Sequence, residues 1–450
     1  MSARSVALGV IRAVEDSDSY ANLLLPVRIE REHLDARDAA LATELTYGTL
    51  RRRGLYDVII SLAAKRPVES IDPPVLDVLR LGAHQLLSMR TAEHAAVSET
   101  VDLVRTVGAR SATGFVNAVL RTISRAPADE WVDRAIATAR SGEEALAIAH
   151  SHPLWVVRAI RQVLVSEGRE DELEAALVAD NVAPAVSLSA LPGLATIDEL
   201  SGARPAEYSP VGAVLAGGDP SSLEAVRAGR ARVQDEGSQL AALALSRARP
   251  VAAGERWLDL CAGPGGKAAL LAAEAQLGGA TVVANELVSA RAGLVRNAVA
   301  PFSRDVVEVV EGDGLRFADQ PRAFDRILLD APCTGLGALR RRPEARWRKQ
   351  PSDVAGLGET QSALLDAAIA AVKPGGLIAY VTCSPHAAET KAVVKAAARR
   401  HPEVRLLDTQ QALASFTRTP LDLAEGTHAQ LWPHRHGTDA MFIQLITVDA

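Results

Sequence analysis

The spacing of hydrophobic residues changes twice along the chain. Up to about residue 128, apolar residues recur at intervals of three and four, which is the period of an amphipathic helix. The clearest examples are Ala39–Leu50, Val75–Leu87 and Val97–Val107. We therefore predict an all-α domain over residues 1–128.

The stretch from 129 to 229 has no single period. Trp155–Leu164 and Glu170–Val178 predict two helices, and Ala185–Leu191 predicts a short strand. Pro210-Val211-Gly212 is typical of a turn. We predict a small α+β connecting domain over residues 129–229.

From about residue 230, short apolar runs alternate with helical stretches. The predicted strands are Arg256–Leu260, Ala280–Asn285, Val306–Val310, Arg326–Asp330, Leu377–Thr382 and Met441–Thr447. This alternation is typical of an α/β fold with a mostly parallel, doubly wound, Rossmann-like sheet. We predict such a domain over residues 230–450, with ligands at the carboxyl ends of its strands.

Composition narrows the class of protein. A chain of 450 residues with 48% hydrophobic and 23% charged residues can form several soluble globular domains. No apolar run approaches the roughly 18 residues of a membrane span, and the N-terminal segment lacks a signal-peptide pattern. We therefore expect a cytoplasmic monomer that does not bind membranes. The net charge of −6 argues against indiscriminate coating of nucleic acid, but it permits a local basic site.

The cysteines and histidines favour neither a disulfide framework nor a metal site. Three cysteines are an odd number in a long chain. The ten histidines show no metal-ligand spacing with them, so we expect no metal.

A glycine-rich turn follows the first predicted strand of the sheet. In Asp259–Lys267 (DLCAGPGGK), the glycines let the backbone approach a ligand closely, although such a turn would equally suit a dinucleotide. Acidic residues then occur at the ends of the next strands: Glu286, Asp313 and Asp330. Carboxylates at these positions would repel phosphates, whereas S-adenosylmethionine is cationic and carries no phosphate. We predict S-adenosylmethionine as the cofactor, with its ribose hydroxyls at Glu286 and its adenine amino group at Asp313.

Two cysteines stand at the ends of neighbouring predicted strands. Cys333 follows Asp330-Ala331-Pro332, and Cys383 lies in Thr382-Cys383-Ser384. Each alone could be a small buried hydrophobic residue. Together they place two thiols and a carboxylate beside the methyl donor. A thiolate that adds to carbon 6 of cytosine makes carbon 5 nucleophilic, so this set predicts methylation of cytosine C5.

At these motifs the sequence resembles the RsmB (Fmu/Sun) family of bacterial 16S ribosomal RNA cytosine-C5 methyltransferases, which carry a fused NusB-like N-terminal domain. In the predicted α/β domain the resemblance rests on Val233–Gln239, Asp259–Lys267, Asp330–Gly335, Thr382–Ser384 and Gly437–Phe442. In the N-terminal part it rests on Arg37–Ala40, Glu44–Gly48, His94–Val101 and Asn117–Arg121. The sequence departs from the family pattern at Glu286, where many members have Asp, and at Met441, where an aromatic residue is common.

The resemblance implies a role for each site residue. Cys383 would form the adduct with carbon 6, Cys333 would assist product release, and Asp330 would contact the ring and the methionine end of the cofactor. The implied cofactor-binding residues are Cys261, Ala262, Gly263, Pro264, Gly265, Gly266, Lys267, Glu286, Asp313 and Asp330. The implied partner is small-subunit ribosomal RNA, naked or in an early assembly particle. The same chemistry would serve on tRNA or 23S rRNA, and a non-catalytic RNA-binding regulator of the antitermination type is a further alternative.

A basic segment, Leu339–Lys349, follows the Cys333 motif. Its predicted RNA-binding residues are Arg340, Arg341, Arg342, Arg346, Arg348 and Lys349. Trp347 could stack on a base or anchor the segment, and a solvated basic loop is the alternative. Gly335 and Gly337 would let this chain approach the target nucleotide. His386 could influence thiolate formation at Cys383.

Overall fold

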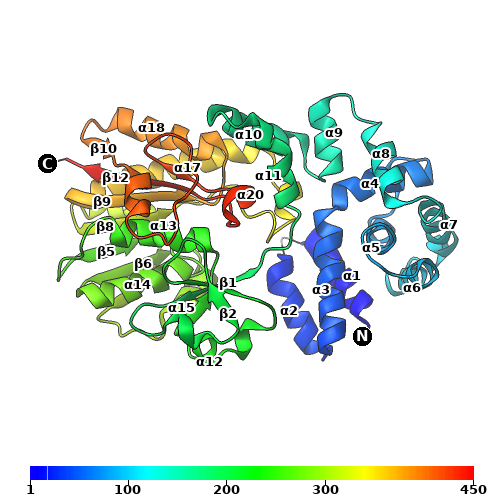
Figure 1. The fold of residues 1–450 in the computed structure, drawn as a ribbon, viewed down its shortest axis with the longest axis horizontal. Coiled ribbons are helices and arrows are strands. Elements are labelled where there is room, and N and C mark those ends of the chain that lie inside the picture. Colours follow the sequence, from blue (N-terminus) through cyan, green and yellow to red (C-terminus); the bar gives the residue numbers. More distant parts are fainter. Residues whose placement is uncertain (18, 450) are drawn as a thin grey trace. The chain divides into compact units, whose positions relative to one another are not determined.

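The computed structural model describes residues 1–17 and 19–449, and their contacts define two compact units (Figure 1). The helical unit comprises Met1–Arg161, Asp171–Val182 and Leu339–Lys349. The α/β unit comprises Gln162–Glu170, Ala183–Ala338 and Gln350–Ala450. The predicted basic segment thus packs within the helical unit, although it lies in the sequence of the α/β domain.

The helical unit is built around a continuous apolar core. Its helices are α1 (Ala3–Asp16), α2 (Ala21–Arg31), α3 (Ala36–Arg51), α4 (Arg53–Ala64), α5 (Pro73–Leu87), α6 (Glu93–Thr106), α7 (Thr113–Ile123), α8 (Ala128–Ile136), α9 (Gly142–Ala149), the first part of α10 (Leu154–Ser166), α11 (Leu173–Ala179) and α16 (Ala345–Arg348). Helix α3 begins where the Asp35 side chain accepts the backbone N–H of Asp38, and α5 begins with Pro73 in its first turn. Helix α5 is buried along most of its length. The helices predicted at Ala39–Leu50, Val75–Leu87 and Val97–Val107 are confirmed.

The main sheet of the α/β unit has eight strands and is mostly parallel. The strands are β5 (Arg256–Asp259), β6 (Thr281–Glu286), β7 (Val307–Glu311), β8 (Phe324–Asp330), β9 (Val372–Thr382), β10 (Val404–Leu406), β11 (Ala429–Gln430) and β12 (Phe442–Val448). Their order is β10-β12-β9-β8-β5-β6-β7, with β11 paired to β12 (Figure 1). Strands β5 to β9 are parallel, and β12 is antiparallel to β9. All six predicted strands are confirmed, whereas the short strands β10 and β11 were not predicted.

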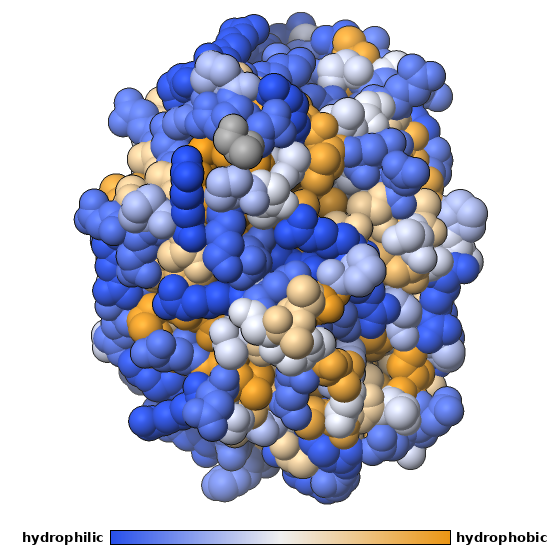
Figure 2. All heavy atoms as spheres, turned by 90° about the vertical axis from the view of Figure 1, so that its left-hand side faces the viewer, coloured by the Kyte–Doolittle hydropathy of each residue, from blue (hydrophilic) through white to orange (hydrophobic). Residues whose placement is uncertain are grey.

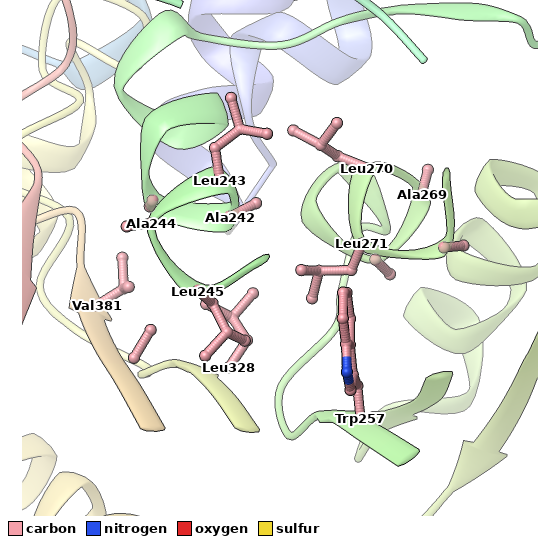
Figure 3. Close-up of a cluster of buried hydrophobic side chains, with 14 of the residues drawn as sticks. Ala242, Leu243, Ala244, Leu245, Trp257, Ala269, Leu270, Leu271, Leu328 and Val381 are labelled. Carbon is pink, nitrogen blue, oxygen red and sulfur yellow. The ribbon is translucent and has the colours of Figure 1, made fainter. Parts of the chain in front are cut away.

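Helices connect the strands of this sheet. They are α13 (Glu236–Arg247), α14 (Gly266–Gly278), α15 (Ser289–Val299), α17 (Pro351–Ala371), α18 (Lys391–Arg400), α19 (Thr409–Ala414) and α20 (Pro433–His436). Helices α13 and α14 contribute Leu245 and Leu271 to the same buried layer as Trp257, Leu328 and Val381 (Figure 3). Burying such a side chain contributes about 1.5–3 kcal/mol, so this layer stabilises the packing of α13 and α14 against the central strands.

A second, antiparallel sheet precedes the main one. Its order is β2-β3-β1-β4, formed by β1 (Val186–Ala190), β2 (Ala203–Pro205), β3 (Gly212–Leu215) and β4 (Ala231–Val233), with the short helix α12 (Glu224–Arg227). Strand β1 confirms the predicted strand at Ala185–Leu191.

The two units divide residues 129–229 differently from the predicted connecting domain. Helices α8, α9 and α11 pack in the helical unit, whereas strands β1 to β3 belong to the α/β unit. The side chain of Gln239 links the antiparallel strands to the α/β unit. From α13 it donates hydrogen bonds to the backbone carbonyls of Leu188 on β1 and of Gln234.

The surface of the α/β unit that faces the viewer in Figure 2 is mostly hydrophilic, with apolar side chains in small separate groups. Dispersed apolar residues of this kind are ordinary on a protein surface. None of the helices in the described part of the chain has the length and apolar content needed to cross a lipid bilayer.

Candidate active site

The two predicted catalytic cysteines meet at the carboxyl ends of β8 and β9. These strands are parallel neighbours, and Asp330 at the end of β8 pairs in register with Val381. The loops that follow bring the sulfur of Cys333 to 3.5 Å from the sulfur of Cys383. The sequence-based prediction that both thiols reach one place is therefore confirmed.

A partly buried ion pair lies close to Cys383. Lys267, in the first turn of α14, donates a hydrogen bond of 2.8 Å from Nζ to Oδ2 of Asp330. Burial lowers the pKa of Lys267, but the charge of Asp330 and the hydrogen bond to it more than offset burial, so the pKa lies above its ordinary value. The positive charge of Lys267 also interacts with Cys383. A fixed cation near a thiol lowers the free-energy cost of forming its thiolate.

The surroundings of Cys333 and Cys261 favour the protonated thiol. The hydrogen bond between Cys333 and Cys383, followed by burial, raises the pKa of Cys333 well above its ordinary value. Burial also raises the pKa of Cys261. Burial thus favours the protonated form of Cys261, and the hydrogen bond between Cys333 and Cys383 favours sharing of one proton by the two sulfurs.

The glycine-rich turn is shaped by close contacts that exclude larger residues. A Cβ atom on Gly263 would lie 2.1 Å from Oε2 of Glu286, and Gly265 adopts a φ of +105° against Ala298. The backbone N–H of Gly263 donates to Oε2 of Glu286 at 3.0 Å, and that of Val288 donates to Oε1 at 3.0 Å. The Glu286 carboxylate is thus held at the end of β6, and its remaining lone pairs can accept hydrogen bonds from hydroxyls.

The predicted cofactor fits the charge of this site. Asp259 is fully buried at the end of β5, close to Asp330 and Lys267 and within reach of the backbone N–H of Cys261. Burial, and then the charge of Asp330, raise the pKa of Asp259 to about 8. Four acidic side chains, Asp259, Glu286, Asp313 and Asp330, thus stand at the ends of neighbouring strands, which suits a cationic ligand without phosphates better than a phosphate-bearing one. Among residues 1–17 and 19–449, no group of three or more His, Cys, Asp or Glu side chains is arranged to hold a metal ion.

Asp313 follows β7 as predicted and has a local structural role. Its Oδ1 accepts the backbone N–H of Leu315 at 3.0 Å, which caps the short 3-10 helix Gly314–Asp319. This hydrogen bond fixes the carboxylate at the strand end. Its contact with adenine remains a prediction.

His386 has a structural partner instead of a thiol. Its Nδ1 accepts the backbone N–H of Ala388 at 3.2 Å and so caps the short 3-10 helix Ala387–Glu389. Burial lowers the pKa of His386. A neutral imidazole with this hydrogen bond stabilises the turn after Cys383, which gives no support to the predicted influence on thiolate formation.

Sequence analysis missed Glu389, which joins the two cysteine loops. It is fully buried and accepts hydrogen bonds from Thr334 and Ser384, the residues that follow Cys333 and Cys383. In the sequence it is one acidic residue just before helix α18, where acidic side chains are common. The polar residue next to each cysteine was the only available signal.

The structure contradicts the RNA-contact prediction for Arg340 and Arg346. Arg346 is 0% exposed and Arg340 is 7% exposed. The guanidinium of Arg346 donates to the backbone carbonyls of Ser151 and Asp180, at 3.0 and 3.2 Å, and to the Asn181 side chain at 2.9 Å. These groups occupy the positions that phosphate oxygens would need.

Two further residues of the basic segment have partners inside the helical unit. Arg348 donates to the carbonyl of Val14 in the last turn of α1 and to those of Ser17 and Ser19 after it, so the phosphate contact predicted for Arg348 competes with these bonds. The Trp347 ring lies 5.7 Å from the guanidinium carbon of Arg53 and so anchors the segment. The remaining candidates for RNA contact, which are half-buried or exposed, are Arg341, Arg342 and Lys349.

The fold also matches a solved structure along its whole length. The crystal structure of a protein designated PH0851 superposes with a TM-score of 0.81, covers 99% of each chain, and is 22% identical in sequence. Together with the glycine-rich turn and the strand-end carboxylates, the Rossmann-like domain defines an S-adenosylmethionine-dependent methyltransferase.

Sequence comparisons then identify the family. The model of the 16S rRNA methyltransferase RsmB/F family matches residues 249–447, and the NusB family model matches residues 1–125. The ribosomal RNA small subunit methyltransferase B of Pseudomonas putida is 32% identical over 95% of this chain and 96% of its own. A relative from Mycobacterium tuberculosis, whose name specifies a methyltransferase without a substrate, is 50% identical over 98% of this chain and 95% of its own. The chain therefore belongs to the RsmB/F family of methyltransferases, with an N-terminal domain of the NusB family.

Proposed function

We propose that this protein methylates carbon 5 of a cytosine in 16S ribosomal RNA, in the cytoplasm, through a covalent adduct with Cys383. The observation that carries the proposal is the 3.5 Å separation of the Cys333 and Cys383 sulfurs beside the Lys267–Asp330 ion pair. The Cys383 thiol interacts with the cation of Lys267, which favours its thiolate, and the Cys333 thiol contacts the Cys383 sulfur. This difference suits the two sulfurs to different tasks.

The residues divide the reaction between them. The thiolate of Cys383, favoured by the charge of Lys267, adds to carbon 6 of the cytosine and makes carbon 5 nucleophilic. S-adenosylmethionine supplies the methyl group on a cationic sulfur. After carbon 5 has gained the methyl group, a base takes the proton from carbon 5 and the electrons of that bond form the double bond between carbons 5 and 6. The bond between carbon 6 and sulfur then breaks, and its electron pair leaves with Cys383 as a thiolate. The Cys333 thiol can then donate a hydrogen bond to the departing Cys383 sulfur.

The other predicted site residues would hold the reactants. Asp330 would contact the pyrimidine ring and the methionine end of the cofactor. The turn Cys261–Lys267, with Glu286 and Asp313, would hold the rest of the cofactor. The NusB-type domain would bind structured RNA together with Arg341, Arg342 and Lys349. The target base has to leave any helix to reach the thiols.

Substitution of each cysteine tests the chemistry. With purified small-subunit RNA and labelled S-adenosylmethionine, Cys383→Ala should abolish methyl transfer. Cys333→Ala should leave protein covalently attached to RNA on a denaturing gel. The opposite pattern would show that the two cysteines exchange roles, and full activity of Cys383→Ala would refute the adduct mechanism.

The choice of RNA needs a separate test, because the chemistry is the same on any cytosine. Naked 16S rRNA, small-subunit particles, 23S rRNA and tRNA should be compared as substrates, and bisulfite sequencing should locate the product in cells with and without the protein. Methylation of tRNA or 23S rRNA alone would overturn the proposed substrate. Binding of RNA without any methylation would favour the regulatory alternative.

A further inference from the structure

The carboxylate of Glu389 bridges the two loops that carry the reactive sulfurs. Its Oε1 accepts the backbone N–H of Thr334 at 2.7 Å, and its Oε2 accepts the Thr334 hydroxyl at 2.5 Å. Oε2 also accepts the hydroxyl of Ser384 at 2.6 Å. Because Thr334 follows Cys333 and Ser384 follows Cys383, one side chain fixes the backbone at both cysteines.

These bonds hold strongly because the carboxylate is buried. Glu389 is 0% exposed, and a carboxylate removed from water is stable only when hydrogen bonds replace its hydration. Hydrogen bonds to an ionised acceptor are shorter and about twice as strong as those between neutral groups. Gln361 reinforces the arrangement by donating from Nε2 to the carbonyl of Pro332 at 2.8 Å, and it also reaches Oε1 of Glu389 at 3.4 Å.

The bridge itself rests on rigid elements. The Tyr380 hydroxyl, from the carboxyl-terminal part of β9, donates to the backbone carbonyl of Glu389 at 2.8 Å. The His386 cap and the hydrogen bond from the Thr390 hydroxyl to the His386 carbonyl fix the turn before Glu389. Side chains supported in this way place reactive groups with the accuracy that catalysis needs.

We propose that Glu389 is a positioning residue, which holds the Cys333 and Cys383 loops together so that the attacking sulfur and the assisting sulfur keep their separation through the reaction. This role rests on the proposed two-cysteine mechanism. Glu389 acts through its hydrogen bonds to Thr334 and Ser384. Its negative charge also disfavours the thiolate form of Cys333, in agreement with a protonated assisting thiol.

Substitutions of Glu389 should differ in effect according to how many hydrogen-bond acceptors they keep. An alanine removes both carboxylate acceptors and leaves the Thr334 N–H without its partner. The Thr334 and Ser384 hydroxyls then keep only their contact of 3.2 Å with each other, which weakens the link between the loops. A glutamine keeps one oxygen and the size of the side chain. Because hydroxyl groups can also accept hydrogen bonds, Glu389→Gln should retain part of the bridge.

Methyl transfer and the spacing of the sulfurs can be measured separately on the full-length protein. In methyl transfer, Glu389→Ala should lower kcat at least a hundredfold and leave the Kd for S-adenosylmethionine within about threefold. Glu389→Gln should lose roughly tenfold in kcat. Glu359→Gln, on the exposed side of α17, should match the wild type.

Phenylarsine oxide reports the spacing without RNA, because its arsenic atom forms bonds to two adjacent thiols and releases water. Glu389→Ala should bind it at least tenfold more weakly than the wild type, and Cys383→Ala defines the signal without a thiol pair. If Glu389→Ala does not fold, Glu389→Gln and Ser384→Ala replace it, each with a smaller loss in both measurements.

The outcomes separate this inference from the proposed function. The positioning role would be overturned if Glu389→Ala kept both the kcat and the arsenical affinity of the wild type. The same holds for Glu389→Gln and Ser384→Ala when they replace it. A loss of arsenical affinity, in a protein whose wild type methylates no cytosine, would support the bridge and reject the proposed reaction. A loss of kcat with unchanged arsenical affinity would also overturn the inference, because the sulfurs would then keep their spacing without Glu389.

Discussion

The backbone N–H of Gly337 donates a hydrogen bond of 2.9 Å to the carbonyl oxygen of Cys383. On its other side, the carbonyl oxygen of Gly337 accepts the backbone N–H of Ala440 at 2.8 Å. A Cβ atom at position 337 would lie 2.0 Å from the Ala440 carbonyl oxygen and 2.9 Å from that of Cys383. Only glycine lets these three segments meet, so Gly337 fastens the loop after Cys333 to the loop of Cys383.

Replacement of this glycine should therefore disturb the thiol pair. We expect Gly337→Ala to lower methyl transfer at least a hundredfold, because the new methyl group pushes against backbone atoms that cannot rotate away. Overpacking of this kind should also lower the free energy of unfolding by about 1–3 kcal/mol. Activity assays and urea unfolding measure the two effects.

Gly356 in α17 is a suitable control for this variant. A Cβ there meets nothing within 4 Å, so Gly356→Ala should retain full activity and gain up to about 1 kcal/mol in stability from its better helix propensity. Equal activity of the two variants would show that the contacts of Gly337 do not matter for the reaction.

The positions of the thiols could be predicted because they depend on regular features. Alternating strands and helices indicate a parallel sheet, and neighbouring parallel strands end at the same edge. Asp330 and Cys383 therefore had to lie near each other once β8 and β9 were recognised. The glycine-rich turn was predictable for the same reason, since it joins β5 to α14.

The contacts of Glu389 and of the basic segment could not be predicted, because they depend on partners distant in sequence. Arg346 lies in a cluster of basic residues that suggests a solvated surface, yet its hydrogen-bond acceptors come from residues near 151 and 180. Glu389 bonds to Thr334, which is 55 residues away. Local patterns carry no information about such pairings, and tertiary contacts override the local preference for solvent.

Arg346 is now expected to stabilise the helical unit. Burial lowers its pKa to about 10, so the guanidinium stays charged near neutral pH and needs all of its acceptors. Arg346→Met keeps much of the volume but leaves the carbonyls of Ser151 and Asp180 without this donor. We expect the free energy of unfolding to fall by about 3–5 kcal/mol, as measured by urea denaturation.

Arg342 provides the matched control for this prediction. Its side chain is exposed and lies over the Tyr20 ring at 5.4 Å, so Arg342→Met should change stability by no more than about 0.5 kcal/mol. RNA affinity should show the reverse order, with a larger loss for Arg342→Met among folded variants. If both substitutions cost the same stability, the buried hydrogen bonds of Arg346 do not contribute as argued.

Asp259 should make the stability of the cofactor-free protein depend on pH. Its pKa is raised from an ordinary value of 3.8 to about 8, first by burial and then by the charge of Asp330. Between these values the folded protein keeps a proton that the unfolded chain releases. The contribution of this group to stability is therefore full below about pH 4 and falls as the pH rises through 8, by at most about 1.4 kcal/mol per pH unit.

Asp259→Asn removes this titration while keeping the shape of the protonated carboxyl group. The two proteins should have similar free energies of unfolding near pH 4, and at pH 8 the variant should be more stable by on the order of 2–4 kcal/mol. The difference must be measured by urea unfolding without cofactor, since a bound cation would favour the ionised carboxylate. Asp305→Asn, at an exposed position, should show a difference that does not change with pH. If the difference in the free energy of unfolding between Asp259→Asn and the wild type also stayed constant with pH, the Asp259 carboxyl group would be ionised in the folded protein. The site would then carry its full negative charge before the cationic ligand binds.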